Sequence, residues 1–269
     1  QHLTMSSGII STADTNLTIA DNLVQGLGIR VRGGTAAHLV HNLITPATYG
    51  VILSGSAVNS AIEHNTIRAG IGGISVTGTG ASGMVIRDNR LGGFGSGIQL
   101  SAPASGRISH NRIEASAVGL RLTSPFSGLI EENDISGASI GVSYETGQLL
   151  SGNRIHGNST GIVSTVGDTT GGLGYFGVTR PNQVYKNAVG VNLQQAVMQN
   201  QHVFANVTGV SGSGSLVPRD FDHANVIEMN AIGIDISGSG QINTVQFNRI
   251  ARNSIGIKPR SGQLIAHNL

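Results

Sequence analysis

The stretch IEHNTIRAGIGGISV, residues 62–76, contains the unit from which the chain is built. Asn65 is followed two residues later by Ile67, eight residues later by Gly73 and nine residues later by Ile74. Residues 108–122, ISHNRIEASAVGLRL, and residues 150–164, LSGNRIHGNSTGIVS, repeat this arrangement. Self-similarity at a spacing of a few tens of residues is the signature of a solenoid, because each unit can bury its apolar side only against its neighbours.

The Asn of each unit sets the register, and we call it position 0. It recurs at residues 22, 42, 65, 89, 111, 133, 153, 182, 225, 248 and 268, and Gln201 takes its place in one unit. Position +8 is Gly in ten consecutive units, from Gly50 to Gly256. Positions −3, +2 and +9 are aliphatic in nearly every unit.

Each unit therefore has three short apolar pieces separated by tight corners. Pieces of three to five residues with a period of two favour strands over helices. We predict an all-β, right-handed parallel β-helix of about eleven to twelve coils, forming one domain over residues 1–269. We expect the Asn to adopt the left-handed conformation at one corner and to form an asparagine ladder along the axis. We expect the Gly at +8 to supply positive φ at a second corner. A second Asn at +5, from Asn158 to Asn253, predicts a second ladder in the later coils.

Composition narrows the classes of function. The chain of 269 residues has no Cys, 11% charged residues, 4% aromatic residues and a formal net charge of +2. The absence of Cys rules out disulfides and thiolate metal sites. No basic run interleaved with aromatic residues is present, so we expect no nucleic-acid partner. No apolar run is long enough for a membrane span, and no motif calls for a cofactor.

The repeat reaches both ends of the chain without an amphipathic capping helix. Bare solenoid ends expose core residues and unpaired strand edges. We therefore expect the chain to be part of a longer protein, or its ends to be covered by flanking domains or by an oligomer.

The repeat units quoted above resemble those of the pectin-lyase-like superfamily. They are most similar to the units of carbohydrate-binding proteins, sugar hydrolases and NosD-like periplasmic proteins. The resemblance covers about Ile19 to Leu269 and implies a long surface suited to an extended polysaccharide, in an extracellular, cell-surface or periplasmic protein. Paired aspartates of the polygalacturonase type and a calcium-binding cluster of the pectate-lyase type are missing. The segment Arg219–His223, sequence RDFDH, resembles loosely the Asp-Pro-His segment of alginate C5-epimerases and lacks its Pro.

The apolar column at −3 breaks twice, at Thr179 and at Asp222, after Gly- and Ser-rich segments that read as loops. Breaks in a regular pattern mark candidate sites. For catalysis we single out Asp222, His223, Arg219 and Arg180, with His or Asp moving a proton and Arg offsetting a carboxylate. For ligand binding we single out Tyr175, Phe176, Asp220 and Asp168. The alternative is that both segments are ordinary surface loops.

A polar column precedes the Asn in five units and reads His41, His64, Asp88, His110 and Glu132. Stacked residues in a parallel sheet lie about 4.8 Å apart, so His64, Asp88 and His110 form a weak candidate metal site. The simpler interpretation is a polar corner in which Asp88 relieves repulsion between imidazoles. Glu63 and Arg87, one position earlier, are expected to form an ion pair between coils.

Three hypotheses for function stay open at this point. The first is a carbohydrate-associated domain of an exported bacterial or phage protein that binds or displays a polysaccharide. The second is an enzyme, namely a polysaccharide lyase, a uronate C5-epimerase or a glycoside hydrolase. The third is a structural stalk or adhesin repeat without a ligand, which the low aromatic content favours.

Overall fold

A computed structural model describes residues 3–68, 70–93, 95–115, 117–167, 172–174, 180–236, 242–259 and 262–269. It shows a parallel β-solenoid of about eleven turns, as the repeat predicts. The chain divides into two compact units, residues 1–135 and 136–269. Among the described residues, the only helical segment is the 3-10 turn η1 (Phe221–His223).

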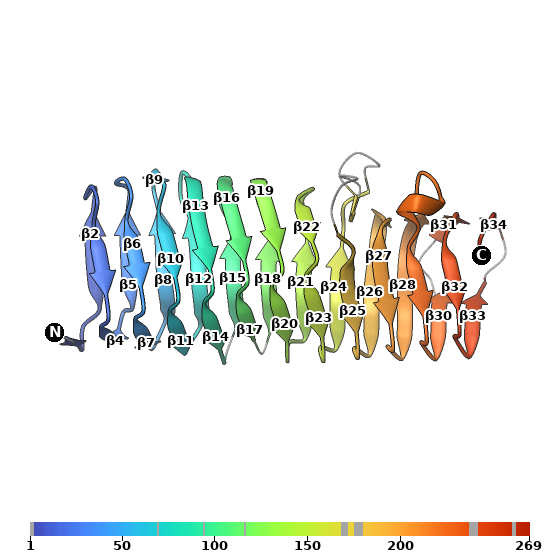
Figure 1. The fold of residues 1–269 in the computed structure, drawn as a ribbon, viewed down its shortest axis with the longest axis horizontal. Coiled ribbons are helices and arrows are strands. Elements are labelled where there is room, and N and C mark those ends of the chain that lie inside the picture. The colour runs from blue at the N-terminus through green and yellow to red at the C-terminus, as the bar shows by residue number, and fades with distance from the viewer. Residues whose placement is uncertain are drawn as a thin grey trace. The chain divides into compact units, whose positions relative to one another are not determined.

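The first unit has three parallel sheets (Figure 1). Sheet A follows the Asn of each repeat and contains β1 (Thr4–Met5), β4 (Leu23–Gly26), β7 (Leu43–Pro46), β11 (Thr66–Arg68), β14 (Arg90–Gly92) and β17 (Arg112–Glu114). Sheet B contains β2 (Ile9–Thr12), β5 (Ile29–Arg32), β8 (Tyr49–Ser54), β12 (Gly72–Thr77), β15 (Ser96–Leu100) and β18 (Val118–Leu122). Sheet C contains β3 (Thr18–Ala20), β6 (His38–Val40), β10 (Ala61–Glu63), β13 (Ala81–Arg87), β16 (Ala104–Ser109) and β19 (Phe126–Glu131), with β9 (Ala57–Val58) paired to β13.

The second unit has the same plan. Sheet A contains β23 (Arg154–His156), β25 (Asn182–Tyr185), β27 (Gln201–Phe204), β29 (Val226–Glu228) and β32 (Arg249–Ala251), and β20 (Asp134–Ser136) lies at the boundary between the units. Sheet B contains β21 (Ile140–Tyr144), β24 (Thr160–Ser164), β26 (Val189–Val197), β28 (Thr208–Leu216), β30 (Ile232–Asp235) and β33 (Ile255–Lys258). The third side contains β22 (Leu149–Ser151), β31 (Ile242–Gln246) and β34 (Leu264–Ala266), with β31 paired to the end of β28.

The core contains the three predicted columns and a fourth at +11, with Leu53, Val76, Leu100, Leu122, Tyr144 and Leu193 fully buried. Residues at +2 are fully buried from Val24 to Ile227, and Leu91 is the most exposed of them at 2%. Residues at +9 are equally buried from Val31 to Ile234. Burial of a side chain of this size contributes about 1.5–3 kcal/mol, so stacking these columns supplies most of the driving force for folding. The last coil is more open, and Ile265 is 40% exposed.

The position-0 Asn residues form the predicted ladder inside the corner. Asn111 is fully buried, and its Nδ2 donates to Oδ1 of Asn133 at 2.9 Å and to the carbonyl oxygen of Ile86 at 2.9 Å. Its own Oδ1 accepts from the backbone nitrogen of Asn89 at 3.1 Å. The second ladder is also present, since Nδ2 of Asn158 donates to Oδ1 of Asn187 at 3.1 Å.

Two expectations are wrong, namely a left-handed Asn at position 0 and a positive φ at the Gly of position +8. The left-handed residue is the one before the Asn, as in His64 with φ 54° and His110 with φ 55°. The Asn side chain points inward and satisfies the polar backbone groups of the turn. The Gly residues at +8 do not have positive φ. A Cβ on Gly97 would lie 2.5 Å from the carbonyl oxygen of Gly119 in the next coil, so close stacking is what requires glycine there.

Candidate functional site

The −3 column is continuous in the structure, and each apparent break in the sequence marks an insertion after a residue of that column. Leu173 forms a parallel bridge with Met198, and Leu216 pairs with Val245, both of which are −3 residues of the following coils. Leu173 and Leu216 are fully buried. Each lies nine residues before the Asn of its own coil instead of three, so the sequence of both coils has six extra residues after this buried Leu.

A charged residue at an apolar position is expected to be turned outward by a local loop, and this is where the structure places Asp222. Asp222 is exposed in η1. Leu216, and not Asp222, fills position −3 in the core of this coil. Thr179 lies outside the described residues, as do three of the predicted ligand-binding residues, namely Asp168, Tyr175 and Phe176.

The second insertion brings together Arg219, Asp220 and His223 at an outward corner of the second unit. Asp220 precedes η1, and its Oδ1 accepts from the backbone nitrogens of Asp222 and His223, both at 3.1 Å. The same oxygen lies 2.5 Å from Nδ1 of His223. Nε of Arg219 lies 3.4 Å from the other oxygen of Asp220.

The hydrogen bond from His223 holds the pKa of Asp220 below its usual range, with smaller contributions from Arg219. Asp220 is therefore ionised near neutral pH, and it keeps the imidazole proton on Nδ1. Nε2 of a neutral His223 is then an acceptor with a fixed orientation. Such a nitrogen can accept a hydrogen bond from a sugar hydroxyl or take up a proton.

Arg180 follows the first insertion and is exposed. Its backbone nitrogen donates to Oγ of Ser151 at 3.0 Å, and its carbonyl accepts from the nitrogen of Gly152 at 2.9 Å. Its guanidinium lies over Gly152, where an added Cβ would meet Cζ at 3.5 Å. Only the coil of Gln201 separates the two insertions, so their bases are two coils apart, roughly 10 Å.

The polar column of the first unit lies at the corner before the Asn ladder. Nε2 of His64 lies 3.9 Å from Oδ2 of Asp88, His110 pairs with Glu132, and the rings of His41 and His64 stack at 5.3 Å. Within the described residues, no group of three or more His, Cys, Asp or Glu side chains converges as a metal site would require.

The ion pair expected between neighbouring coils is present. Arg87 contacts Glu63, and Nε2 of His38 lies 2.9 Å from the same carboxylate. Desolvation opposes ionisation of Glu63, but hydrogen bonds from Arg87 and His38 outweigh it and lower the pKa of Glu63. Arg87 and His38 are both substantially exposed, so this cluster contributes little net stability.

One feature that sequence reasoning missed is an aromatic column on sheet A of the second unit. The rings of His156, Tyr185 and Phe204 stack at 4.9 and 5.0 Å, and His202 lies 4.4 Å from Phe204. The first three occupy position +3 of successive coils, which is the signal that would have revealed them. Because each ring face is covered by the next ring, the column presents ring edges outward. It stabilises the stack of coils and offers few free faces for a sugar.

The sequence and fold of this β-solenoid match a known protein family. The chain belongs to the NosD family: the family model described as periplasmic copper-binding protein (NosD) matches residues 3–148 and 59–211. The solenoid also fits the resemblance to the pectin-lyase-like superfamily.

Among solved structures, the chain is similar to the A-module of mannuronan C-5 epimerase AlgE6 from Azotobacter vinelandii. The two share 15% identity with a TM-score of 0.34, over 94% of this chain and 65% of that module. A likeness at this level carries no argument about activity. A search of curated proteins finds no match. In the part of the chain that the structure describes, no helix has the length and apolar character needed to cross a membrane.

Proposed function

We propose that this NosD-family β-solenoid is an exported domain that binds or displays an extended polysaccharide at the corner from which its two insertions emerge. One observation carries the proposal: Leu173 and Leu216 complete the buried column beneath the insertions. The scaffold therefore does not need the inserted residues for its core. Segments that add polar groups to a complete scaffold are typical of recognition loops.

The chemistry of the insertions suits sugar hydroxyls. His223 supplies an oriented acceptor, and Arg180 and Arg219 supply planar sets of donors. Bases two coils apart let one linear polymer contact both insertions. The periplasmic character of the NosD family supports an exported location.

A second candidate function, a uronate lyase or C5-epimerase, is favoured by the short bond between Asp220 and His223. In that reaction Nε2 of His223 would accept the proton α to the uronate carboxylate, and the electron pair of the broken C–H bond would pass into the carboxylate. Arg219 would offset the charge that develops there. Asp222 is exposed and one residue away, so it is the alternative proton acceptor.

The name of the family raises the question of copper. The described residues do not fit a resident copper ion. The chain has no Cys, and no three His, Cys, Asp or Glu side chains converge in its described parts. Of its four Met, Met84 and Met198 are fully buried in the core, and the exposed Met229 lies in another coil. Copper sites in proteins are built from such convergent imidazole, thiolate and thioether ligands.

The proposal is tested by incubating the protein with alginate, pectate and a neutral glucan, and following both binding and unsaturated or epimerised products. We expect saturable binding that His223→Ala weakens, with His110→Ala as the matched control, because His110 also pairs with a carboxylate and lies outside both insertions. Product formation that stops in His223→Ala would establish the enzyme instead. Absence of binding and of products would leave the stalk hypothesis.

A further inference from the structure

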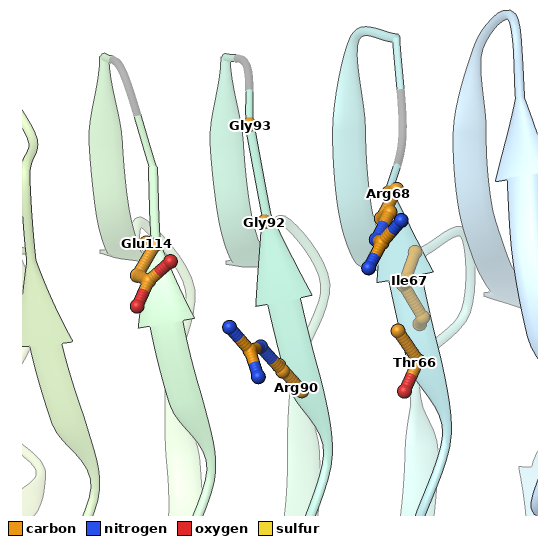
Figure 2. Close-up of a pocket in the computed structure, with 7 residues that line it drawn as sticks. All are labelled: Thr66, Ile67, Arg68, Arg90, Gly92, Gly93 and Glu114. Carbon is orange, nitrogen blue, oxygen red and sulfur yellow. The ribbon is translucent and has the colours of Figure 1, made fainter.

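A notch opens on the outward face of sheet A in the first unit, far along the sequence from the two insertions. It has a volume of about 270 Å³ and is lined by Thr66, Ile67, Arg68, Arg90, Gly92, Gly93 and Glu114. Gly92 pairs with Arg68 on one side and with Glu114 on the other, so the missing side chain creates the gap (Figure 2). The strands that border it lie two coils apart, roughly 10 Å.

The fold does not require a glycine at position 92. Gly92 has no positive φ, and a Cβ added to it would have no heavy atom within 4 Å. The core glycines of the same coils differ, since a Cβ on Gly97 would lie 2.3 Å from Cγ2 of Ile113. The effect of glycine at position 92 is therefore to keep the notch open.

The notch carries an uncompensated positive charge. Arg68 and Arg90 are both exposed, and neither has an ion-pair partner among the described residues. Glu114 is the acidic residue that lines the notch, and it already pairs with Arg112 on its own strand. Figure 2 shows the guanidinium of Arg90 projecting into the space beside Gly92, toward β17.

We propose that this notch binds the carboxylate of an acidic sugar residue, a uronate. Planar guanidinium groups match a carboxylate with paired hydrogen bonds. The hydroxyl of Thr66 and the carboxylate of Glu114 are placed to accept from ring hydroxyls beside it. The volume lies just below the range of drug-sized pockets, so it holds a single sugar ring. The inference rests on the proposed function in taking the ligand to be a polysaccharide, and it adds the sugar class and a second site.

The test uses the whole chain and NMR titration of the backbone amides. The probes are an oligogalacturonate, a neutral oligoglucan of equal length, galacturonate monosaccharide and inorganic phosphate. Arg90→Gln removes a charge from the notch, and Gly92→Leu fills the notch while keeping both charges. Arg32→Gln is the matched control, because Arg32 is an exposed arginine of sheet B without an ion-pair partner among the described residues.

We expect the oligogalacturonate to shift the amides of Gly92 and Gly93, and the neutral oligoglucan to leave them unchanged. Loss of one charge-assisted contact should weaken the binding about tenfold to a hundredfold in Arg90→Gln, with a similar loss in Gly92→Leu and none in Arg32→Gln. Uronate binding that survives both notch variants would overturn this inference and leave the proposed function intact.

Two further outcomes separate the claims. Phosphate that shifts the Gly92 amide as strongly as galacturonate would show an anion site without sugar specificity, and would overturn the inference. Galacturonate bound at the notch, with no polysaccharide bound anywhere, would uphold the notch and refute the proposed function.

Discussion

Replacing Asn111 by Ala should cost roughly 2–6 kcal/mol of the free energy of unfolding. Asn111 is fully buried, and its side chain is the acceptor for the backbone N–H of Asn89 and a donor to the carbonyl of Ile86. Ala removes these bonds and the ladder bond to Asn133, and it leaves the two backbone groups unpaired in a place that water does not reach. Each buried polar group left unsatisfied costs about 1–3 kcal/mol, and two such groups give the range.

The matched control is Asn268→Ala in the last coil. Asn268 makes the same kind of bonds, to the carbonyls of Val245 and Ala266 at 2.9 and 3.0 Å, but it is only partly buried. Water can replace its side chain, so the expected cost is below about 1 kcal/mol. Urea unfolding followed by circular dichroism measures both variants. Equal costs for the two would refute the reasoning that burial of the ladder, and not its mere presence, stabilises the coils.

Three other predictions follow from the geometry. Gly97→Ala should destabilise the chain by roughly 1–3 kcal/mol, whereas Gly92→Ala should change its stability by less than about 0.5 kcal/mol, as thermal unfolding of the pair would show. Because Asp220 has a lowered pKa in the folded chain, its bond to His223 should persist above the pKa of the unfolded chain and be lost as the pH falls through the folded pKa; amide NMR signals of the turn that change at the pH where a free Asp titrates, and not below it, would contradict this. Zinc, copper or calcium should raise the melting temperature little, and a saturable rise that disappears in His64→Ala would establish the polar column as a metal site.

The fold could be predicted because every coil solves the same packing problem. Aliphatic residues at −3, +2 and +9 must all face one interior, so a linear pattern fixes three sheets and their register. The roles of the corner residues could not be predicted this way. Asn65 and the preceding His64 are adjacent, and only the backbone shows that His64 takes the left-handed turn while Asn65 turns inward.

The irregularity of the −3 column is the sequence signal for the candidate site, whose role stays a prediction. Asp222 stands three residues before Asn225, and its charge is the reason to expect it outside the core, but a linear register cannot show where the insertion begins. The apolar Leu216, nine residues before Asn225, is the sequence signal that the insertion begins after it. Likewise, a low average aromatic content hid the column that begins at His156, since composition does not report that three rings share one position.

Deletion of residues 217–222 asks whether the second insertion is a functional addition to a solenoid that is complete without it. The deletion joins Leu216 to His223 and restores the regular spacing of three residues between the −3 residue and Asn225. We predict that the melting temperature stays within a few degrees of the wild type, because Pro218 is the one buried residue among those deleted and Leu216 still fills the −3 column, while polysaccharide binding falls at least tenfold. A variant that unfolds, or one that binds polysaccharide as the full chain does, would contradict the claim.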